Sequence, residues 1–95
     1  MYKVIDANDT GKTRKLLEHC GGKGIFVCAH PERIKEKCAA YGVRTPQAIG
    51  YNDFKNMLIE NEVFNNKDTV IYIDELEKFV SCCVPYLAGY TLTKD

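Results

Sequence analysis

Two short clusters in this chain combine residue types that phosphate chemistry needs. Gly11-Lys12-Thr13 directly precedes a helical pattern, and Asp74-Glu75 ends a short apolar run. A glycine lets the backbone approach a phosphate, a lysine reaches its charged oxygens, and a threonine hydroxyl can bind Mg²⁺. The apolar run would deliver both carboxylates to the carboxyl edge of a sheet, where ligands bind in open α/β folds. Together the clusters predict a site for a nucleoside triphosphate, most simply ATP with Mg²⁺.

Strand and helix patterns alternate along the chain and would position these clusters. Short apolar runs predict strands at 2–5, 24–29, 47–51, 70–73 and 89–93. Apolar residues at helical spacing predict helices at 13–20, 31–41, 52–61 and 76–83. The near-continuous apolar run 24–29 is typical of a central strand that is covered on both faces. This alternation predicts a parallel α/β sheet with helices on both faces.

Length and composition indicate one soluble domain over residues 1–95. The chain is 45% hydrophobic and 27% charged, with no apolar run near the roughly 20 residues of a membrane helix. Its N-terminus does not resemble a signal peptide, so we expect a cytoplasmic protein with no membrane partner. The 13 basic and 13 acidic residues cancel, which leaves nucleic acid undecided as a partner. So short a chain exposes much of its surface, and we expect association with itself or with another protein.

The cysteines and several charged residues fit ordinary structural roles. The five cysteines are odd in number and mostly occupy apolar positions, which favours free thiols in a reducing compartment. His19-Cys20 and the Cys28-x-His30 pair lack the spacing of a structural zinc site. We interpret Lys35 and Lys37 as solvated charges on a helix surface.

In motifs and element order the chain resembles a known family. Gly11-Lys12-Thr13 completes the second half of the Walker A motif, and 70–73 with Asp74-Glu75 resembles a Walker B segment. Nearly the whole chain is similar to the additional-strand, catalytic-glutamate division of P-loop NTPases, which includes RecA-like and helicase-like ATPases and small phage proteins. The resemblance implies a three-layer α/β/α sandwich with a mainly parallel five-stranded sheet in the order 5-1-4-3-2. Walker A and Walker B would then follow neighbouring strands of a single minimal domain.

The resemblance also implies a role for each residue of the site. The nucleotide would be bound by Asn8, Asp9, Thr10, Gly11, Lys12, Thr13 and Arg14. Thr13 and Asp74 would hold Mg²⁺, and Glu75 would polarise the attacking water, so that Lys12 and Glu75 are the expected catalytic residues. Thr91 or Thr93 would sense the γ-phosphate.

The chain departs from the family pattern inside the loop. Asp6 stands where the first P-loop glycine would be, and Asp9 adds a second carboxylate, so that two negative charges oppose a polyphosphate. No arginine finger stands out among Arg14, Arg33 and Arg44. We therefore expect weak or partner-dependent ATP hydrolysis.

Other hypotheses remain open for the same residues. One is a non-catalytic interaction or regulatory module with a degenerate P-loop. Another is a small-molecule or nucleotide kinase, which would need an acceptor pocket and a lid in a very short chain. The plainest interpretation makes Gly11-Lys12-Thr13 an ordinary strand-to-helix turn, and Asp74-Glu75 acidic residues that complement a helix dipole.

Overall fold

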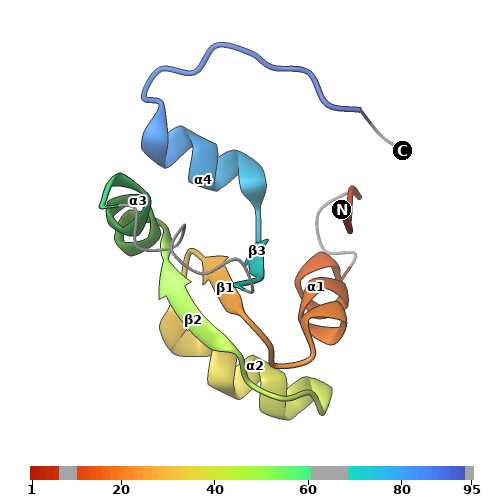
Figure 1. The fold of residues 1–95 in the computed structure, drawn as a ribbon. Coiled ribbons are helices and arrows are strands. Elements are labelled where there is room, and N and C mark those ends of the chain that lie inside the picture. The colour runs from red at the N-terminus through yellow and green to blue at the C-terminus, as the bar shows by residue number, and fades with distance from the viewer. Residues whose placement is uncertain (7–10, 61–68, 94–95) are drawn as a thin grey trace.

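A sheet of three parallel strands forms the centre of the molecule. The computed structural model describes residues 1–6, 11–60 and 69–93 (Figure 1). Strand β1 (Ile25–Cys28) lies between β2 (Gln47–Gly50) and β3 (Ile71–Ile73), so the order is β2-β1-β3. Ile25 is in register with Gln47 on one side and with Ile71 on the other. The central position predicted for the apolar run 24–29 is confirmed.

Helices precede, connect and follow the strands. They are α1 (Lys12–Cys20), the short 3-10 helix η1 (Pro31–Arg33), α2 (Ile34–Tyr41), α3 (Tyr51–Ile59) and α4 (Leu76–Cys83). Helix α1 ends at Gly21, which is left-handed and donates its N–H to the Leu17 carbonyl. Pro31 opens the turn before α2, where its missing N–H leaves no bond unmade. None of the helices in the described ranges combines the length and apolar character that crossing a membrane requires.

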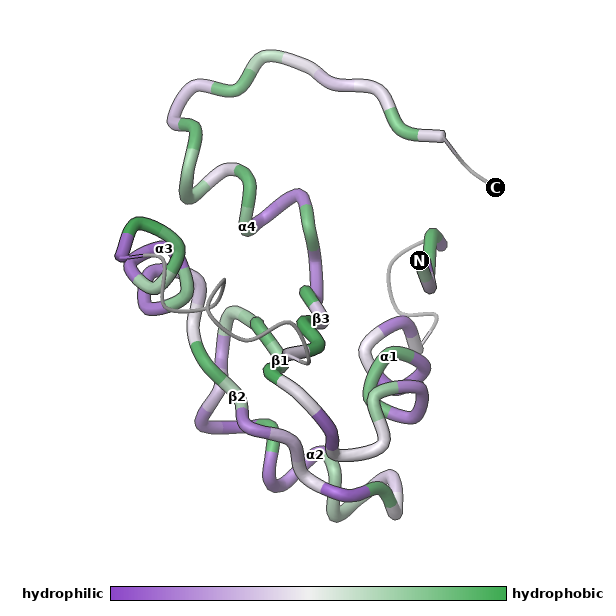
Figure 2. The backbone as a smooth tube through the Cα atoms, in the orientation of Figure 1, coloured by the Kyte–Doolittle hydropathy of each residue, from purple (hydrophilic) through white to green (hydrophobic). Residues whose placement is uncertain are grey.

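Helices cover both faces of the sheet. Successive side chains of β1 point to opposite faces, and each face packs against different helices. Ile25 and Val27 face one layer, where they pack with residues of α3 and α4 such as Phe54 and Phe79. The opposite face carries Phe26, and there β1 packs with residues of α1 and α2. Hydrophobic residues accordingly gather along the strands (Figure 2). The core therefore has two halves, one on each side of a thin sheet.

The predicted five-stranded sheet and its order 5-1-4-3-2 are wrong. Residues 2–5 form no strand, and the Tyr2 ring instead stacks on His19 of α1, with centroids 3.9 Å apart. Residues 89–93 also form no strand, and the segment runs exposed beyond α4 (Figure 1). The predicted order would put 24–29 at an edge, yet that segment is the most apolar of the strands. Placing it between two partners buries all four residues of β1.

Gly24 allows the start of β1 to lie close to the residue that precedes β3. Gly24, directly before β1, has a φ of 74°, and a side chain there would collide with the Val70 carbonyl. That carbonyl accepts a hydrogen bond from the Ile25 N–H at 2.9 Å, which extends the ladder toward β3. Only a residue without a Cβ satisfies both conditions at this point.

Candidate functional site

The carboxyl ends of all three strands meet at one edge of the sheet. His30 follows β1, Tyr51 follows β2, and Asp74 follows β3. The chain passes from β1 to β2 on one side of β1, whereas β3 lies on its other side, so the strand order reverses at β1. In open parallel sheets, ligands bind in the crevice that such a reversal creates. The candidate site lies at this edge.

Thr13 and Asp74, the two predicted Mg²⁺ ligands, are in direct contact. The Thr13 hydroxyl donates to the Asp74 carboxylate, with Oγ1 3.1 Å from Oδ1 and 3.0 Å from Oδ2. Thr13 is the second residue of α1, which begins after Gly11 with a φ of 78°. The start of α1 is therefore held against the end of β3 by side chains 61 positions apart.

Lys12 and Glu75, the two predicted catalytic residues, also meet. The Lys12 ammonium lies 3.9 Å from Glu75 Oε1, and the two side chains are 21% and 35% exposed. Glu75 has a φ of 55°, a left-handed conformation that is strained for a residue with a side chain. Such strain is concentrated at functional sites, and here it sets the turn between Asp74 and α4.

Burial dominates the electrostatics of Asp74. It raises the pKa of the carboxyl above its ordinary value, and the hydrogen bond from Thr13 only partly offsets this effect. The negative charge of Glu75 raises the pKa further, while Lys37 and Lys12 lower it. An ionised carboxylate with little water around it gains from a nearby cation.

Tyr51 stabilises the turn between β3 and α4, which contains Asp74 and Glu75. Its hydroxyl donates to the Asp74 carbonyl at 2.7 Å, and burial raises the pKa of this phenol above its ordinary value, so it stays protonated. Its neighbour Cys28 is also buried, which raises the pKa of the thiol to about 11. Both groups are neutral near pH 7, and Cys28 is therefore a poor nucleophile.

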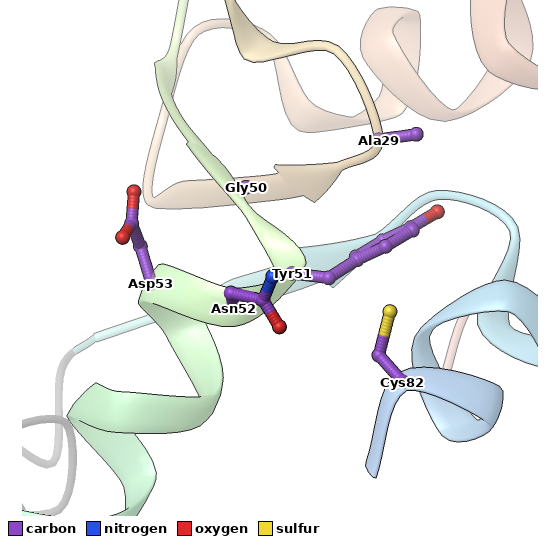
Figure 3. Close-up of a pocket in the computed structure, with 6 residues that line it drawn as sticks. All are labelled: Ala29, Gly50, Tyr51, Asn52, Asp53 and Cys82. Atoms are coloured by element: carbon purple, nitrogen blue, oxygen red, sulfur yellow. The ribbon is translucent and has the colours of Figure 1, made fainter. Parts of the chain in front are cut away.

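Two adjoining cavities open at this edge. A small one, of about 140 Å³, is lined by Thr13, Cys28, Ala29, His30, Ile34, Lys37, Tyr51, Asp74, Glu75 and Lys78. A larger one, of about 460 Å³, is lined by Ala29, Gly50, Tyr51, Asn52, Asp53 and Cys82 (Figure 3). Ala29 and Tyr51 line both cavities. In the view of Figure 3, the Tyr51 ring lies between Ala29 and Cys82.

The other predicted nucleotide-binding residues are distributed differently. Asn8, Asp9 and Thr10 lie outside the described residues. Arg14 points away from Asp74, with its guanidinium 5.3 Å from the Tyr41 ring centre and its Nε 3.9 Å from a Glu18 oxygen. Asp6, the carboxylate at the position of the missing glycine, lies 3.7 Å from the Lys15 ammonium. Its charge is therefore partly offset by a lysine outside the candidate site.

The remaining expectations concern metals and the C-terminal threonines. Thr91 and Thr93 lie in the exposed segment after α4. In the ranges that the structure covers, no group of three or more His, Cys, Asp and Glu side chains could hold a metal.

Lys37, Tyr51 and Lys78 line the small cavity but were not among the predicted site residues. Lys37, interpreted as a solvated surface charge, is half-buried and lines the cavity beside Asp74. Its position three residues after the buried Ile34 places it beside the apolar stripe of α2, a signal that the sequence does contain. Tyr51 directly follows β2, so its position at the end of a predicted strand was also a signal. Lys78 carries no comparable signal, because only the packing of α4 brings it to this edge.

Comparison with other proteins adds no candidate to these observations. The chain matches no protein-family model, no curated protein and no solved structure.

Proposed function

We propose that this chain binds a nucleoside triphosphate with Mg²⁺, most simply ATP, and hydrolyses it slowly or with the help of a partner. The observation that carries the proposal is the pair of contacts Thr13–Asp74 and Lys12–Glu75 at the start of α1. The four residues that the sequence predicts for one reaction lie together, although two come from the start of the chain and two from beyond residue 73. The left-handed Gly11 and the N–H groups of the first helical turn support phosphate binding at the same place.

The residues present fit Mg²⁺. It prefers hard oxygen ligands and usually takes one or two from the protein, with the rest from phosphates and water. The Thr13 hydroxyl and the Asp74 carboxylate are such donors, and they already lie within hydrogen-bond distance of each other. A bound Mg²⁺ would neutralise charge on the phosphate oxygens.

Lys12 and Glu75 would exchange partners when a nucleotide binds. This pair is long at 3.9 Å and its two side chains are only partly buried, so a phosphate can displace Glu75 from Lys12. Lys12 would then contact phosphate oxygens, and the released Glu75 carboxylate would orient a water and accept its proton. Because binding must break this contact, we expect modest affinity and slow turnover.

A binding experiment tests the phosphate site. We expect a fluorescent ATP analogue to bind the wild type in the presence of Mg²⁺ and to bind Lys12→Ala at least about tenfold more weakly, since a charge-assisted contact is lost. Lys23→Ala is the control, because Lys23 is an exposed lysine in the turn after α1. Equal binding by wild type and Lys12→Ala would contradict the proposal.

A turnover experiment on the same proteins tests the reaction. Glu75→Gln should retain nucleotide binding and lose hydrolysis by roughly 10²-fold or more, because the amide cannot accept the proton. Glu77→Gln, on the exposed side of the same helix, serves as its control. Equal turnover by wild type and Glu75→Gln would leave Glu75 without the proposed role.

A non-catalytic interaction module is the second candidate. The observation that favours it is that Lys12 contacts Glu75 and Thr13 contacts Asp74, so that the polar and charged groups of the site satisfy one another. Such a module would show no Mg²⁺-dependent rise in melting temperature with ATP up to millimolar concentration.

The proposed nucleotide and the thiols suggest a place in the cell. All five cysteines are free, which suits a reducing compartment, and we propose the cytoplasm as the location. A protein partner or a second copy of the chain could supply the cationic group that completes hydrolysis.

A further inference from the structure

Two lysines from opposite faces of the sheet reach the small cavity beside Asp74. Lys37 belongs to α2 and Lys78 to α4, helices that pack on different faces of β1. Both side chains nevertheless line the cavity of about 140 Å³, together with Thr13 and Asp74. Cationic groups thus converge on the cavity from both helix layers.

Two carboxylates, Asp74 and Glu75, and two lysines line this cavity, and the lysines favour an anion once Asp74 holds Mg²⁺. Among the described residues, Lys12 pairs with Glu75, whereas neither Lys37 nor Lys78 forms an ion pair. A third basic side chain of the wall, His30, lies 3.4 Å from Glu32 on the outside. The two lysine charges are therefore available to a ligand that enters beside Asp74.

The size of the cavity selects a small group. Sites that hold a drug-sized ligand usually span about 300–1,000 Å³, which is well above the small cavity and includes its larger neighbour. A volume of about 140 Å³ suits a phosphoryl group, but it does not suit a nucleoside. Size and charge therefore point to the same class of ligand.

We propose that the small cavity receives the terminal phosphoryl group of the bound nucleoside triphosphate, and that Lys37 and Lys78 neutralise that group from the two helix layers. The inference rests on the proposed nucleotide site and adds two binding residues to it. These lysines would supply, within one chain, cationic charge of the kind that an arginine finger supplies in other phosphate-transferring proteins. ADP lacks this phosphoryl group and would leave the cavity empty.

The test compares Mg²⁺-ATP with Mg²⁺-ADP by calorimetric titration of wild type, Lys37→Met and Lys78→Met. Each variant should bind ATP about tenfold or more weakly, because a cationic contact to the terminal phosphoryl group is lost, while ADP affinity should stay within about twofold. Lys35→Met is the matched control, since Lys35 is an exposed neighbour on the same helix. Lys37→Arg, which keeps the charge, should restore most of the ATP affinity.

The outcomes separate this inference from the proposal on which it rests. If the wild type binds ATP but Lys37→Met and Lys78→Met bind it equally well, the nucleotide site stands and the inference is wrong. Equal losses for ATP and ADP would also overturn it, because they indicate a general charge effect. If the wild type binds neither nucleotide, the proposed function fails and the inference fails with it. Thermal melts of each variant show whether it is folded.

Discussion

At the scale of single residues, Asp74 is the residue whose proposed role in binding a cation opposes the stability of the fold. It ends a strand, is partly buried, and has two principal neighbours that pull its pKa in opposite directions. The donated hydrogen bond from Thr13 favours the carboxylate, whereas burial and Glu75 disfavour it, and the disfavouring effects are larger. A partly buried carboxylate of this kind favours the binding of a cation, but its burial lowers the stability of the fold.

We predict that Asp74→Asn stabilises the fold and abolishes Mg²⁺-dependent nucleotide binding. Because the folded-state pKa of Asp74 lies above its ordinary value of 3.8, the folded chain holds this proton more tightly than the unfolded chain. The contribution of Asp74 to stability is thus lost as pH rises through the folded-state pKa. Urea unfolding should show a larger free energy of unfolding for Asp74→Asn at pH 7, and the difference should shrink toward pH 4.

Asp53→Asn is the control for this prediction, because Asp53 is exposed in the first turn of α3. It should change the pH dependence of unfolding much less. A wild type more stable than Asp74→Asn at pH 7 would show that the Thr13 hydrogen bond outweighs the burial of the carboxylate.

At the scale of elements, local sequence patterns located the strands that pair. Strands β1, β2 and β3 fall within the predicted segments 24–29, 47–51 and 70–73, because each is apolar or β-branched and flanked by turn residues. The two remaining predictions, 2–5 and 89–93, have suitable residues but no partner strand. Pairing depends on neighbours that a local pattern does not contain, and this also explains the wrong strand order.

The residues of the candidate site also fall into those that local sequence patterns predict and those that depend on packing. Thr13, Asp74, Lys12 and Glu75 could be predicted because each stands where a parallel strand ends or a helix begins. Tyr51 also stands where a strand ends and a helix begins, whereas the contribution of Lys37 and Lys78 depends on how α2 and α4 pack against the sheet. Asn8, Asp9 and Thr10 lie outside the described residues and remain predictions.

Gly24 gives a prediction at the level of the sheet. Gly24→Ala should destabilise the fold by about 1–2 kcal/mol or more, because a left-handed residue with a Cβ is strained and this Cβ meets the Val70 carbonyl. Gly89→Ala is the matched control, since a Cβ at Gly89 would have no neighbouring atom within 4 Å. Urea unfolding of both variants provides the measurement, and similar losses in both would contradict a special role for Gly24.

At the scale of the whole molecule, stability comes from the two halves of the core and little from the C-terminal segment. Phe26 is completely buried in the central strand, whereas Tyr86, after α4, is completely exposed. The segment also exposes Val84, Leu87, Tyr90 and Leu92. Apolar residues contribute to folding only when they leave water, so these side chains add little to the fold.

We predict that deletion of residues 86–95 changes the free energy of unfolding by less than about 1 kcal/mol, as expected for surface positions. Phe26→Ala is the contrasting variant and should destabilise the fold by about 3–5 kcal/mol. Chemical unfolding of both proteins checks the prediction. A large loss on deletion would show that the C-terminal segment packs against the body of the protein.

The central position of β1 has a consequence for the synthesis of this protein. The ribosome makes β1 first, then β2, and last of the three β3, which completes the other edge of β1. Until then, an apolar Ile-Phe-Val-Cys strand has one unpaired edge, the kind of edge that promotes aggregation of nascent chains. Thr13 likewise has no Asp74 to contact, so the candidate site can form only after β3 and Asp74 have been synthesised.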